Sequence, residues 1–497
     1  MERHLLLERM SLKTPFFRAF GPLLFGRQAG AVQDRLRRFD CLEDVYGALG
    51  DLFPEKMLDP ANIGTNSRRR CLPPVVTFWA FVAQVLSPKT SCREITHRIE
   101  VWWRWANLRI RPGLTASAYC QGRQRLRLET LQLINHHLAW NLERNVLNAE
   151  RPLAGRDVKI IDATHVSLPD TPENQAVWPQ PGGQKPGCGF PLLKMAGLFS
   201  LASGALLAHA TGPCREHEGS LFRQLWFTLR KGDVILGDRL YCSWCEMAAL
   251  GQRGIDTVVR LHQFRPTDAQ GQRLGEGDRL VQWERPRACP KTWSREDFAL
   301  LPAQLTVRLI TIKITAPGFR PEEITLATTL VDPELYPADT LRALYARRWD
   351  IELHFAQLKT TLQMDTLRCQ SPSMIEKELE IHLIAYNLVR SLMQKAAQLH
   401  HVPLGRLSFK ASLDFLRHAA TAIQASTRTP RKQQTLIDDL LTAIAREQVP
   451  KRPGRSEPRA RKRRPKNYQL LTKPRAEMKV IPHREKYRAP RPKSPLS

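Results

Sequence analysis

The pattern of apolar and polar positions makes the first part of the chain helical. An apolar run at 75–86 predicts a buried helix. Ser91 begins a capping-box pattern, which predicts the start of a second helix. Thr115 is expected to cap a long helix that continues to Ile134. These signals predict a mostly helical N-terminal region over residues 1–150.

The periodicity then changes to that of an α/β core. A short apolar run at 158–161 predicts a strand that ends at Asp162, and a second apolar run at 234–236 leads directly into Gly237 and Asp238. Further elements are expected as two strands around a turn at 203–204, helices over 219–230 and 244–251, and a strand over 257–261. Strands that alternate with helices in this way predict a mixed sheet covered by helices.

A second change in pattern interrupts this core. Residues 263–330 are polar at first and then rich in β-branched residues, which predicts a β-rich insertion, and helices resume at Asp339. The predicted organisation is an N-terminal helical, DNA-binding region at 1–150, a first core part at 151–262, the insertion at 263–330, a second core part at 331–400, C-terminal helices at 401–450 and a basic disordered tail at 451–497.

The net charge indicates a polyanionic partner. The chain of 497 residues has 76 Lys and Arg against 48 Asp and Glu, a formal charge of +28. Such an excess favours nucleic acid, with an anionic membrane surface as the rival. Half of the excess lies at 451–497, where 17 Lys and Arg face 3 Asp and Glu. That tail is expected to contact phosphate without reading sequence; the alternative is a tail that only aids solubility.

Membrane spans and structural metal sites find little support. The uncharged runs at 71–88 and 195–214 are interrupted by proline or glycine, and the first residues do not form a secretory signal. No membrane partner and a cytoplasmic location are therefore expected. Cys242 and Cys245 form a CxxC pair, but no second pair accompanies them, which favours reduced cysteines over a zinc site.

The most informative segment for chemistry runs from Tyr345 to Lys359. On a regular helix of about 100° per residue, Tyr345, Arg348, Glu352 and Lys359 fall within roughly 60° of arc, beside an apolar stripe. One interpretation is a polar functional ridge on a helix that the apolar stripe holds against the core. The other is a solvated face with ordinary pairs such as Arg348 with Glu352.

Three carboxylates favour the functional interpretation. Asp162 and Asp238 each follow a short apolar strand, and Glu352 lies on the polar ridge. Carboxylates that converge repel one another unless a cation lies between them. Mg²⁺ accepts carboxylate oxygens, and a pair of such ions can stabilise both sides of an in-line phosphoryl displacement. We therefore expect these three acids to hold Mg²⁺, with Mn²⁺ as a substitute.

These residues resemble the signature of a known family. Tyr345, Arg348, Glu352 and Lys359 fit the Tyr-x2-Arg-x3-Glu-x6-Lys pattern, and Asp162 and Asp238 fit the first two acids, of the DDE transposases of bacterial insertion sequences, in insertion-sequence family four. The resemblance implies an RNase H-like catalytic core with the β-rich insertion. It also implies cut-and-paste transposition on double-stranded DNA, namely terminal inverted repeats and target, by a homodimer in a synaptic complex associated with the bacterial nucleoid.

The remaining residues of the pattern receive roles from their chemistry. Arg348 and Lys359 are expected to hold DNA phosphate, Arg348 with a planar fork and Lys359 as a point charge. Tyr345 is expected to hydrogen-bond a phosphate or stack on a base. Arg239, next to Asp238, is a further phosphate candidate. Two other functions remain as alternatives. The intact set of acids argues against a catalytically inactive transposase-derived DNA-binding protein, and the N-terminal helical region and the long β-rich insertion argue against a related metal nuclease of repair, which needs neither.

Overall fold

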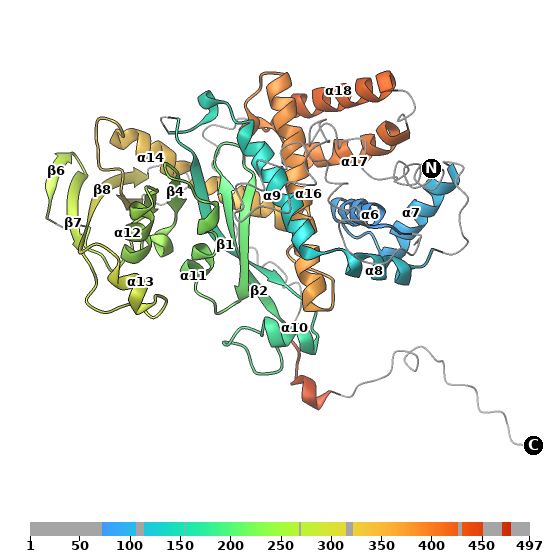
Figure 1. Ribbon diagram of the computed structural model, residues 1–497, viewed down its shortest axis with the longest axis horizontal. Coiled ribbons are helices and arrows are strands. Elements are labelled where there is room, and N and C mark those ends of the chain that lie inside the picture. The colour runs from blue at the N-terminus through green and yellow to red at the C-terminus, as the bar shows by residue number, and fades with distance from the viewer. Residues whose placement is uncertain are drawn as a thin grey trace, which may run out of the picture.

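The computed structural model describes residues 72–105, 114–153, 155–267, 270–314, 322–425, 430–450 and 470–478. Within them, one nine-stranded sheet has the order β3-β2-β1-β4-β5-β9-β8-β7-β6, and helices lie on both sides of it (Figure 1). Its strands are β1 (Val158–Ser167), β2 (Leu192–Ser200), β3 (Leu206–Pro213), β4 (Val234–Gly237), β5 (Asp256–Arg260), β6 (Gln272–Gly275), β7 (Asp278–Glu284), β8 (Gln304–Ile314) and β9 (Glu322–Thr328).

The helices fall before, within and after the sheet in the sequence. Those before it are α6 (Pro74–Leu86), α7 (Cys92–Trp105), α8 (Ala116–Arg125) and α9 (Leu128–Arg144). Those between strands are α10 (Pro172–Val177), α11 (Glu218–Arg223), α12 (Trp244–Gln252) and α13 (Arg295–Ala299). Those after the sheet are α14 (Ala338–Ala346), α15 (Asp350–Ala356), α16 (Pro372–Leu399), α17 (Phe409–Ala425) and α18 (Pro430–Arg446).

Strand β1 separates two hydrophobic cores. Ile160 and Val166 belong to the core that also contains Ile351 and Phe355 of α15. Ile161 belongs to the other core, which includes residues of α11 and α12. Successive side chains of a strand point to opposite faces of the sheet. Residues in step with Ile160 therefore face α15 and α16.

The prediction that the first strand ends at Asp162 is wrong. Strand β1 continues to Ser167, and Asp162 lies within it, opposite Gly197 of the antiparallel strand β2. The polar residues after Asp162 looked like the end of a strand. They remain in the ladder because β2 supplies the backbone partners as far as the pair of Ser167 with Leu192.

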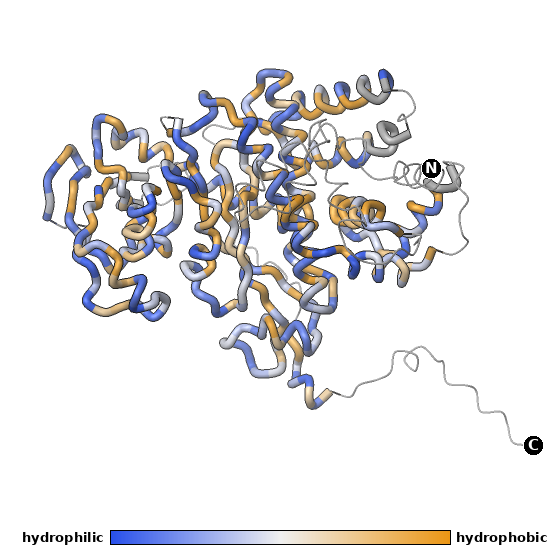
Figure 2. Tube along the Cα trace, in the orientation of Figure 1, coloured by the Kyte–Doolittle hydropathy of each residue, from blue (hydrophilic) through white to orange (hydrophobic). Residues whose placement is uncertain are grey.

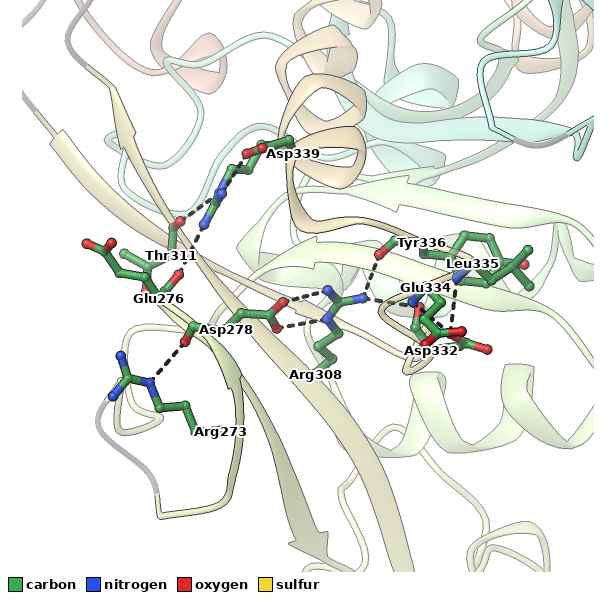
Figure 3. Close-up of polar contacts among 12 residues, drawn as sticks. Arg273, Glu276, Asp278, Arg308, Thr311, Asp332, Glu334, Leu335, Tyr336 and Asp339 are labelled. Atoms are coloured by element: carbon green, nitrogen blue, oxygen red, sulfur yellow. Dashed lines mark hydrogen bonds and ion pairs between the residues drawn. The ribbon is translucent and has the colours of Figure 1, made fainter.

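The β-rich segment extends the sheet that the core begins. Strand β9 pairs antiparallel with β5, and β8, β7 and β6 follow in order. Arg308 of β8, which is 0% exposed, donates from Nε to Asp278 Oδ1 at 2.8 Å and from Nη1 to the Tyr336 carbonyl oxygen at 2.7 Å (Figure 3). This buried guanidinium connects the extension to the loop that leads into α14.

Two predicted helices are shorter than expected. The helix after Thr115 divides into α8 and α9, because Leu126 adopts an extended backbone (φ −62°, ψ 132°) that buries its side chain. The cap itself is confirmed, since Thr115 Oγ1 accepts a hydrogen bond from the Ala118 N–H at 3.1 Å. The helix expected over 219–230 is α11 followed by a 3-10 turn at Trp226–Thr228.

The helices outside the sheet share its core. Nearly all residues of α6 are buried, and their side chains join the core that contains β1. Figure 2 shows this helix mostly in the colour of hydrophobic residues. The 28-residue helix α16 packs against α6, α9, α17 and α18. Among the described residues, no helix has the length and apolar character needed to cross a membrane.

The basic tail is ordered where the structure describes it. Residues 451–469 and 479–497 lie outside the described residues, so the prediction of disorder there stays a prediction. Residues 470–478 contradict it, because they contain a 3-10 turn at Arg475–Glu477 that contacts the loop before β2. The Arg475 guanidinium forms an ion pair with Asp170, which provides the physical reason for order in this segment.

A buried carboxyl group lies between α9, α16 and β3. Glu380 is 1% exposed, and its Oε1 accepts a hydrogen bond from Asn135 Nδ2 at 2.8 Å. His209 Nε2 lies 3.5 Å from Glu380 Oε2. Burial raises the pKa of Glu380 to about 7 and lowers the pKa of His209 to about 4. At a pH between about 4 and about 7, the Glu380 carboxyl group is therefore protonated and the His209 ring is deprotonated, so both side chains are neutral.

We expect Glu380→Gln to remove a pH dependence of stability. A carboxyl group whose pKa is raised in the folded state stabilises fully below its unfolded pKa of 4.5, and this contribution disappears as the pH rises through 7. The loss is at most about 3 kcal/mol, from about 1.4 kcal/mol per pKa unit. Chemical denaturation of both proteins at several pH values measures the difference.

Glu378→Gln is the matched control. Glu378 lies in the same helix and accepts hydrogen bonds from the backbone N–H groups of Arg368 and Cys369 at 2.9 and 2.8 Å. Its replacement should lower stability and retain the pH dependence, because Glu380 remains. A Glu380→Gln protein with the wild-type pH profile would contradict the assignment.

Candidate active site

Asp162 and Asp238 lie side by side on the sheet. Strands β1 and β4 are parallel, with Ile160 paired to Leu236, so two residues further along each chain Asp162 and Asp238 share a register. Both are in step with residues of the core that contains α15. The observed pairing therefore places Asp162 and Asp238 on the same face of the sheet, whereas the sequence predicts that they meet at the ends of their strands.

Asp238 is held by a tight turn after β4. Its Oδ1 accepts a hydrogen bond from the Leu240 N–H at 2.8 Å and caps the 3-10 turn Arg239–Tyr241. Gly237 allows this turn, because a Cβ there would lie 3.0 Å from the Tyr241 Cβ. Gly237 is therefore the last residue of the strand, and the turn that follows fixes the orientation of the Asp238 carboxylate.

The segment with the Tyr-Arg-Glu-Lys pattern is helical but not uniform, so the prediction of one regular helix is wrong. Tyr345 is in α14, Arg348 in a 3-10 turn at Arg347–Trp349, Glu352 in α15 and Lys359 in a π-helical turn at Gln357–Thr361. A 3-10 turn rotates each residue further than an α-helix does, and a π turn rotates it less. The calculated arc of roughly 60° therefore does not apply.

Arg348 nevertheless connects two of the three acids. Its Nη1 lies 3.8 Å from Asp162 Oδ2 and its Nη2 lies 3.6 Å from Glu352 Oε1. The Arg348 side chain is 14% exposed, whereas that of Glu352 is 49% exposed. The ordinary pair of Arg348 with Glu352 is therefore present, and the contact with Asp162 adds a link from the helix to the sheet.

Lys359 and Tyr345 complete the contacts between the helical segment and the sheet. Lys359 Nζ donates a hydrogen bond to Thr164 Oγ1 at 3.1 Å, two residues after Asp162 in β1. Tyr345 is 8% exposed, and burial raises its pKa to about 12, so its phenol stays protonated. Its position beside Arg348 and Asp238 places a hydroxyl group at the site.

The electrostatics of Asp162 are dominated by burial. The pKa of Asp162 is raised to about 6, because burial and the charge of Asp238 outweigh the Ala163 N–H and Arg348, which act in the opposite direction. The Ala163 N–H donates to Asp162 Oδ1 at 2.8 Å. A buried carboxylate beside a second carboxylate is stabilised when a cation binds both.

Arg239 and Trp349 lie at the edge of this group. Arg239 is exposed, and its Nη1 donates to Gln263 Oε1 at 3.0 Å, so it is not gathered with the acids. Sequence reasoning missed Trp349, which is 56% exposed and has the Arg348 guanidinium 5.1 Å from its ring centre. The sequence does contain a signal for it, because Trp349 is an aromatic residue that directly follows Arg348 of the pattern.

The three acids have the oxygen ligands that a hard divalent cation prefers, but their side chains are not arranged around one point. Carboxylate oxygens are the ligands that Mg²⁺ prefers. Among the described residues, however, no three His, Cys, Asp or Glu side chains gather closely enough to hold a metal ion. The Arg348 guanidinium lies between Asp162 and Glu352 instead. Ion binding therefore requires Arg348 to change its contacts.

Comparisons with known proteins relate the chain to transposases. The model of a family described as transposase DDE domain matches residues 153–388, which include all three acids. The chain is similar to the transposase InsG for insertion sequence element IS4 of Escherichia coli strain K12, with 29% identity over 455 residues, 89% of this chain and 98% of that one. It is also similar to the transposase for insertion sequence element IS231F of Bacillus thuringiensis subsp. israelensis, with 24% identity over 279 residues, 49% of this chain and 57% of that one.

One solved structure also resembles the chain. It is that of the piggyBac transposase synaptic complex with hairpin DNA, with a TM-score of 0.39 and 11% identity. The match covers 79% of this chain and 82% of that chain.

Proposed function

Because the chain belongs to the DDE transposases of bacterial insertion sequences, we propose that it binds the terminal inverted repeats of an insertion sequence and catalyses Mg²⁺-dependent strand cleavage and strand transfer in cut-and-paste transposition. The observation that carries this proposal is the contact of Arg348 with both Asp162 and Glu352, together with the parallel pairing of β1 and β4, which brings Asp238 into register with Asp162. These are the groups that hydrolysis and transfer of a phosphodiester need in one place.

The strand order supports an RNase H-like core as part of the proposal. Strands β3, β2 and β1 form an antiparallel set, and β4 and β5 run parallel to β1 on its other side. In this arrangement α11 and α12 cover one face of the sheet, and α15 and α16 cover the other. The β-rich segment then interrupts the core between β5 and α14.

The three carboxylates are assigned to the metal. We propose that Asp162, Asp238 and Glu352 hold Mg²⁺, with Mn²⁺ as a substitute. When bound, the ions would make a water or a 3′-hydroxyl group a stronger nucleophile and stabilise the leaving oxygen. The charge of Asp238 acts on Asp162, and the Glu352 side chain is more exposed than that of Asp162, at 49% against 25%.

The cations and aromatic residues are assigned to DNA. Arg348 is expected to exchange its two carboxylate partners for a DNA phosphate, which its planar fork fits in a bidentate manner. Lys359 supplies a point charge beside Thr164. Tyr345 donates a hydrogen bond from its protonated phenol, and Arg239 contacts phosphate at the rim of the site. Trp349 presents an exposed ring to a base or sugar.

The proposed partner is double-stranded DNA, both terminal repeats and target, bound by a homodimer in a synaptic complex. The excess of positive charge favours contact with the phosphate backbone. The N-terminal region at 1–150 is proposed to add contacts to the repeats. Helices α6 to α9 of that region pack on the same core as β1, so these contacts would be held rigidly relative to the acids.

Cleavage of its own ends is the direct test of this function. We expect the full chain, incubated with Mg²⁺ and DNA that carries the repeats flanking its gene, to nick that DNA at the boundary of the repeats. DNA with scrambled ends and reactions with EDTA are the controls, and nicks are mapped on sequencing gels. A catalytically inactive DNA-binding protein would retard the same DNA without nicks, and a repair nuclease would nick it without regard to the ends.

A further inference from the structure

A fourth carboxylate, that of Glu218, lies at the end of the sheet where Asp238 lies. Strand β3 pairs with β2 as far as Pro213, and Glu218 begins α11 a few residues later. Helix α11 packs on β1, on β2 and on the 3-10 turn that Asp238 caps. It covers the face of the sheet opposite to α15, so Glu218 and Glu352 come from opposite faces.

The packing of α11 directs Glu218 toward the turn of Asp238. Phe222 comes four residues after Glu218, so the two side chains lie on one face of the helix. The Phe222 ring meets the Tyr241 ring edge-on, with ring centres 5.6 Å apart. Tyr241 is the last residue of the turn that Asp238 caps. The face of α11 that carries Glu218 therefore contacts the turn that orients Asp238.

The Tyr241 hydroxyl group points to a ligand in this place. Tyr241 is 4% exposed, and within the described part of the chain its hydroxyl group makes no hydrogen bond of normal geometry. Burial raises the pKa of its phenol, and the charges of Glu218, Asp162 and Asp238 act in the same direction. The hydroxyl group therefore lies among three carboxylates. Since a buried polar group without a partner is unfavourable, a water or a ligand bound there would satisfy it.

A structural ion pair of Glu218 with Lys194 is the rival explanation. Lys194 Nζ lies 3.9 Å from Glu218 Oε1, whereas it donates to the Glu216 carbonyl oxygen at the shorter distance of 2.7 Å. Burial and the charge of Asp238 raise the pKa of Glu218, and Lys194 lowers it without reversing the shift. Lys194 therefore offsets only part of the negative charge that Glu218 adds to the site.

We propose that Glu218 is a fourth carboxylate of the proposed Mg²⁺ site, which attracts the cation by its charge and through a bridging water beside the Tyr241 hydroxyl group. The inference rests on the proposed function for its metal. A role through water is assigned because, in the described ranges, no three acidic side chains converge closely enough to hold an ion directly. Groups that act on a metal in this way typically contribute roughly 10- to 100-fold to its affinity.

The first test measures cation binding by the full chain without DNA. Electron paramagnetic resonance of free Mn²⁺ should show that Glu218→Gln binds the ion roughly 10- to 100-fold more weakly, because the amide keeps the size of the side chain and loses its charge. Glu216→Gln is the matched control and should bind like the wild type, since the Glu216 side chain lies against Gly212. Wild-type affinity in Glu218→Gln would overturn the proposal.

The second test separates a charge at the cation site from a structural ion pair. In EDTA, Glu218→Gln should melt at the wild-type temperature or above it, because the repulsion with Asp162 and Asp238 is relieved. Added Mg²⁺ should then raise the melting temperature of the variant less than that of the wild type. A lower melting temperature in EDTA, with an unchanged gain from Mg²⁺, would confine Glu218 to its pair with Lys194 and refute the proposal.

Asp162→Asn distinguishes failure of this inference from failure of the proposed function. Its Mn²⁺ binding should be lost, because Asp162 is one of the three acids assigned to the metal. If Asp162→Asn loses binding and Glu218→Gln does not, the fourth carboxylate alone is refuted. If both variants bind Mn²⁺ like the wild type, the proposed metal site is refuted, and this inference falls with it.

Discussion

Glu352→Gln is expected to abolish DNA cleavage and leave the binding of end DNA nearly intact. The Glu352 side chain is 49% exposed and contacts the Arg348 guanidinium at 3.6 Å, so an amide of the same size fits without disturbing the fold. The amide cannot supply the negative charge that holds a divalent cation. We expect single-turnover cleavage in Mg²⁺ to fall by roughly a thousandfold or more, which is the scale of losing one preorganised electrostatic group.

A neighbour on the same helix provides the control for this result. Asp350 also begins α15, but its partner is Arg347 at 3.3 Å, away from Asp162. Asp350→Asn makes the same change from carboxylate to amide and should cleave at nearly the wild-type rate. Asp162→Asn and Asp238→Asn should behave like Glu352→Gln. Cleavage at the wild-type rate by Glu352→Gln would remove Glu352 from the metal site.

The sequence predicted the position of Asp238 relative to its strand better than that of Asp162. Asp238 was placed correctly after its strand because a run of apolar residues leads into Gly237, which marks a turn. Asp162 was assigned to the end of its strand and lies within it. The residues after it, such as Thr164 and His165, are polar, and only the ladder with β2 keeps them extended. Long-range pairing of this kind leaves no periodic signal in one sequence.

The turns of the helical segment could not be predicted for a related reason. A 3-10 turn at Arg347–Trp349 and a π turn at Gln357–Thr361 depend on contacts such as that of Arg347 with the Leu201 carbonyl oxygen at 2.9 Å. Arg475 shows the same limit. In the sequence, nothing distinguishes Arg475 from the other Lys and Arg residues of the tail. What sets it apart is its contact with Asp170, which lies 305 residues earlier in the chain.

The position of Arg348 changes what its replacement should do. From the sequence, a structural Arg348 would pair with Glu352 and little else, and a functional one would hold phosphate. In the structure it neutralises both Asp162 and Glu352, at 3.8 and 3.6 Å. It therefore stabilises the acids while no cation is bound, and the proposed function then requires it to release them. Both roles are testable in one variant.

Arg348→Ala is expected to make the stability of the protein depend on Mg²⁺. Without the guanidinium, the carboxylates of Asp162 and Glu352 lose their partner, so the melting temperature in EDTA should fall below that of the wild type. Added Mg²⁺ should raise the melting temperature of the variant more than that of the wild type, because binding to the folded state alone is stabilising and no guanidinium competes for the acids. Thermal melts across a Mg²⁺ titration measure both effects without any DNA.

The same variant should cleave slowly even when Mg²⁺ has restored its stability. If Arg348 positions the phosphate, its loss misplaces the scissile bond, and a shift of about 1 Å can cost roughly 100-fold in rate. Arg348→Lys should recover little of this rate, because the planar fork is lost while the charge remains. Arg347→Ala is the control, since Arg347 lies in the same turn and pairs with Asp350. Wild-type cleavage by Arg348→Ala at saturating Mg²⁺ would confine Arg348 to a structural role, whereas slow cleavage by a fully stable variant would support a role of the guanidinium in the reaction itself.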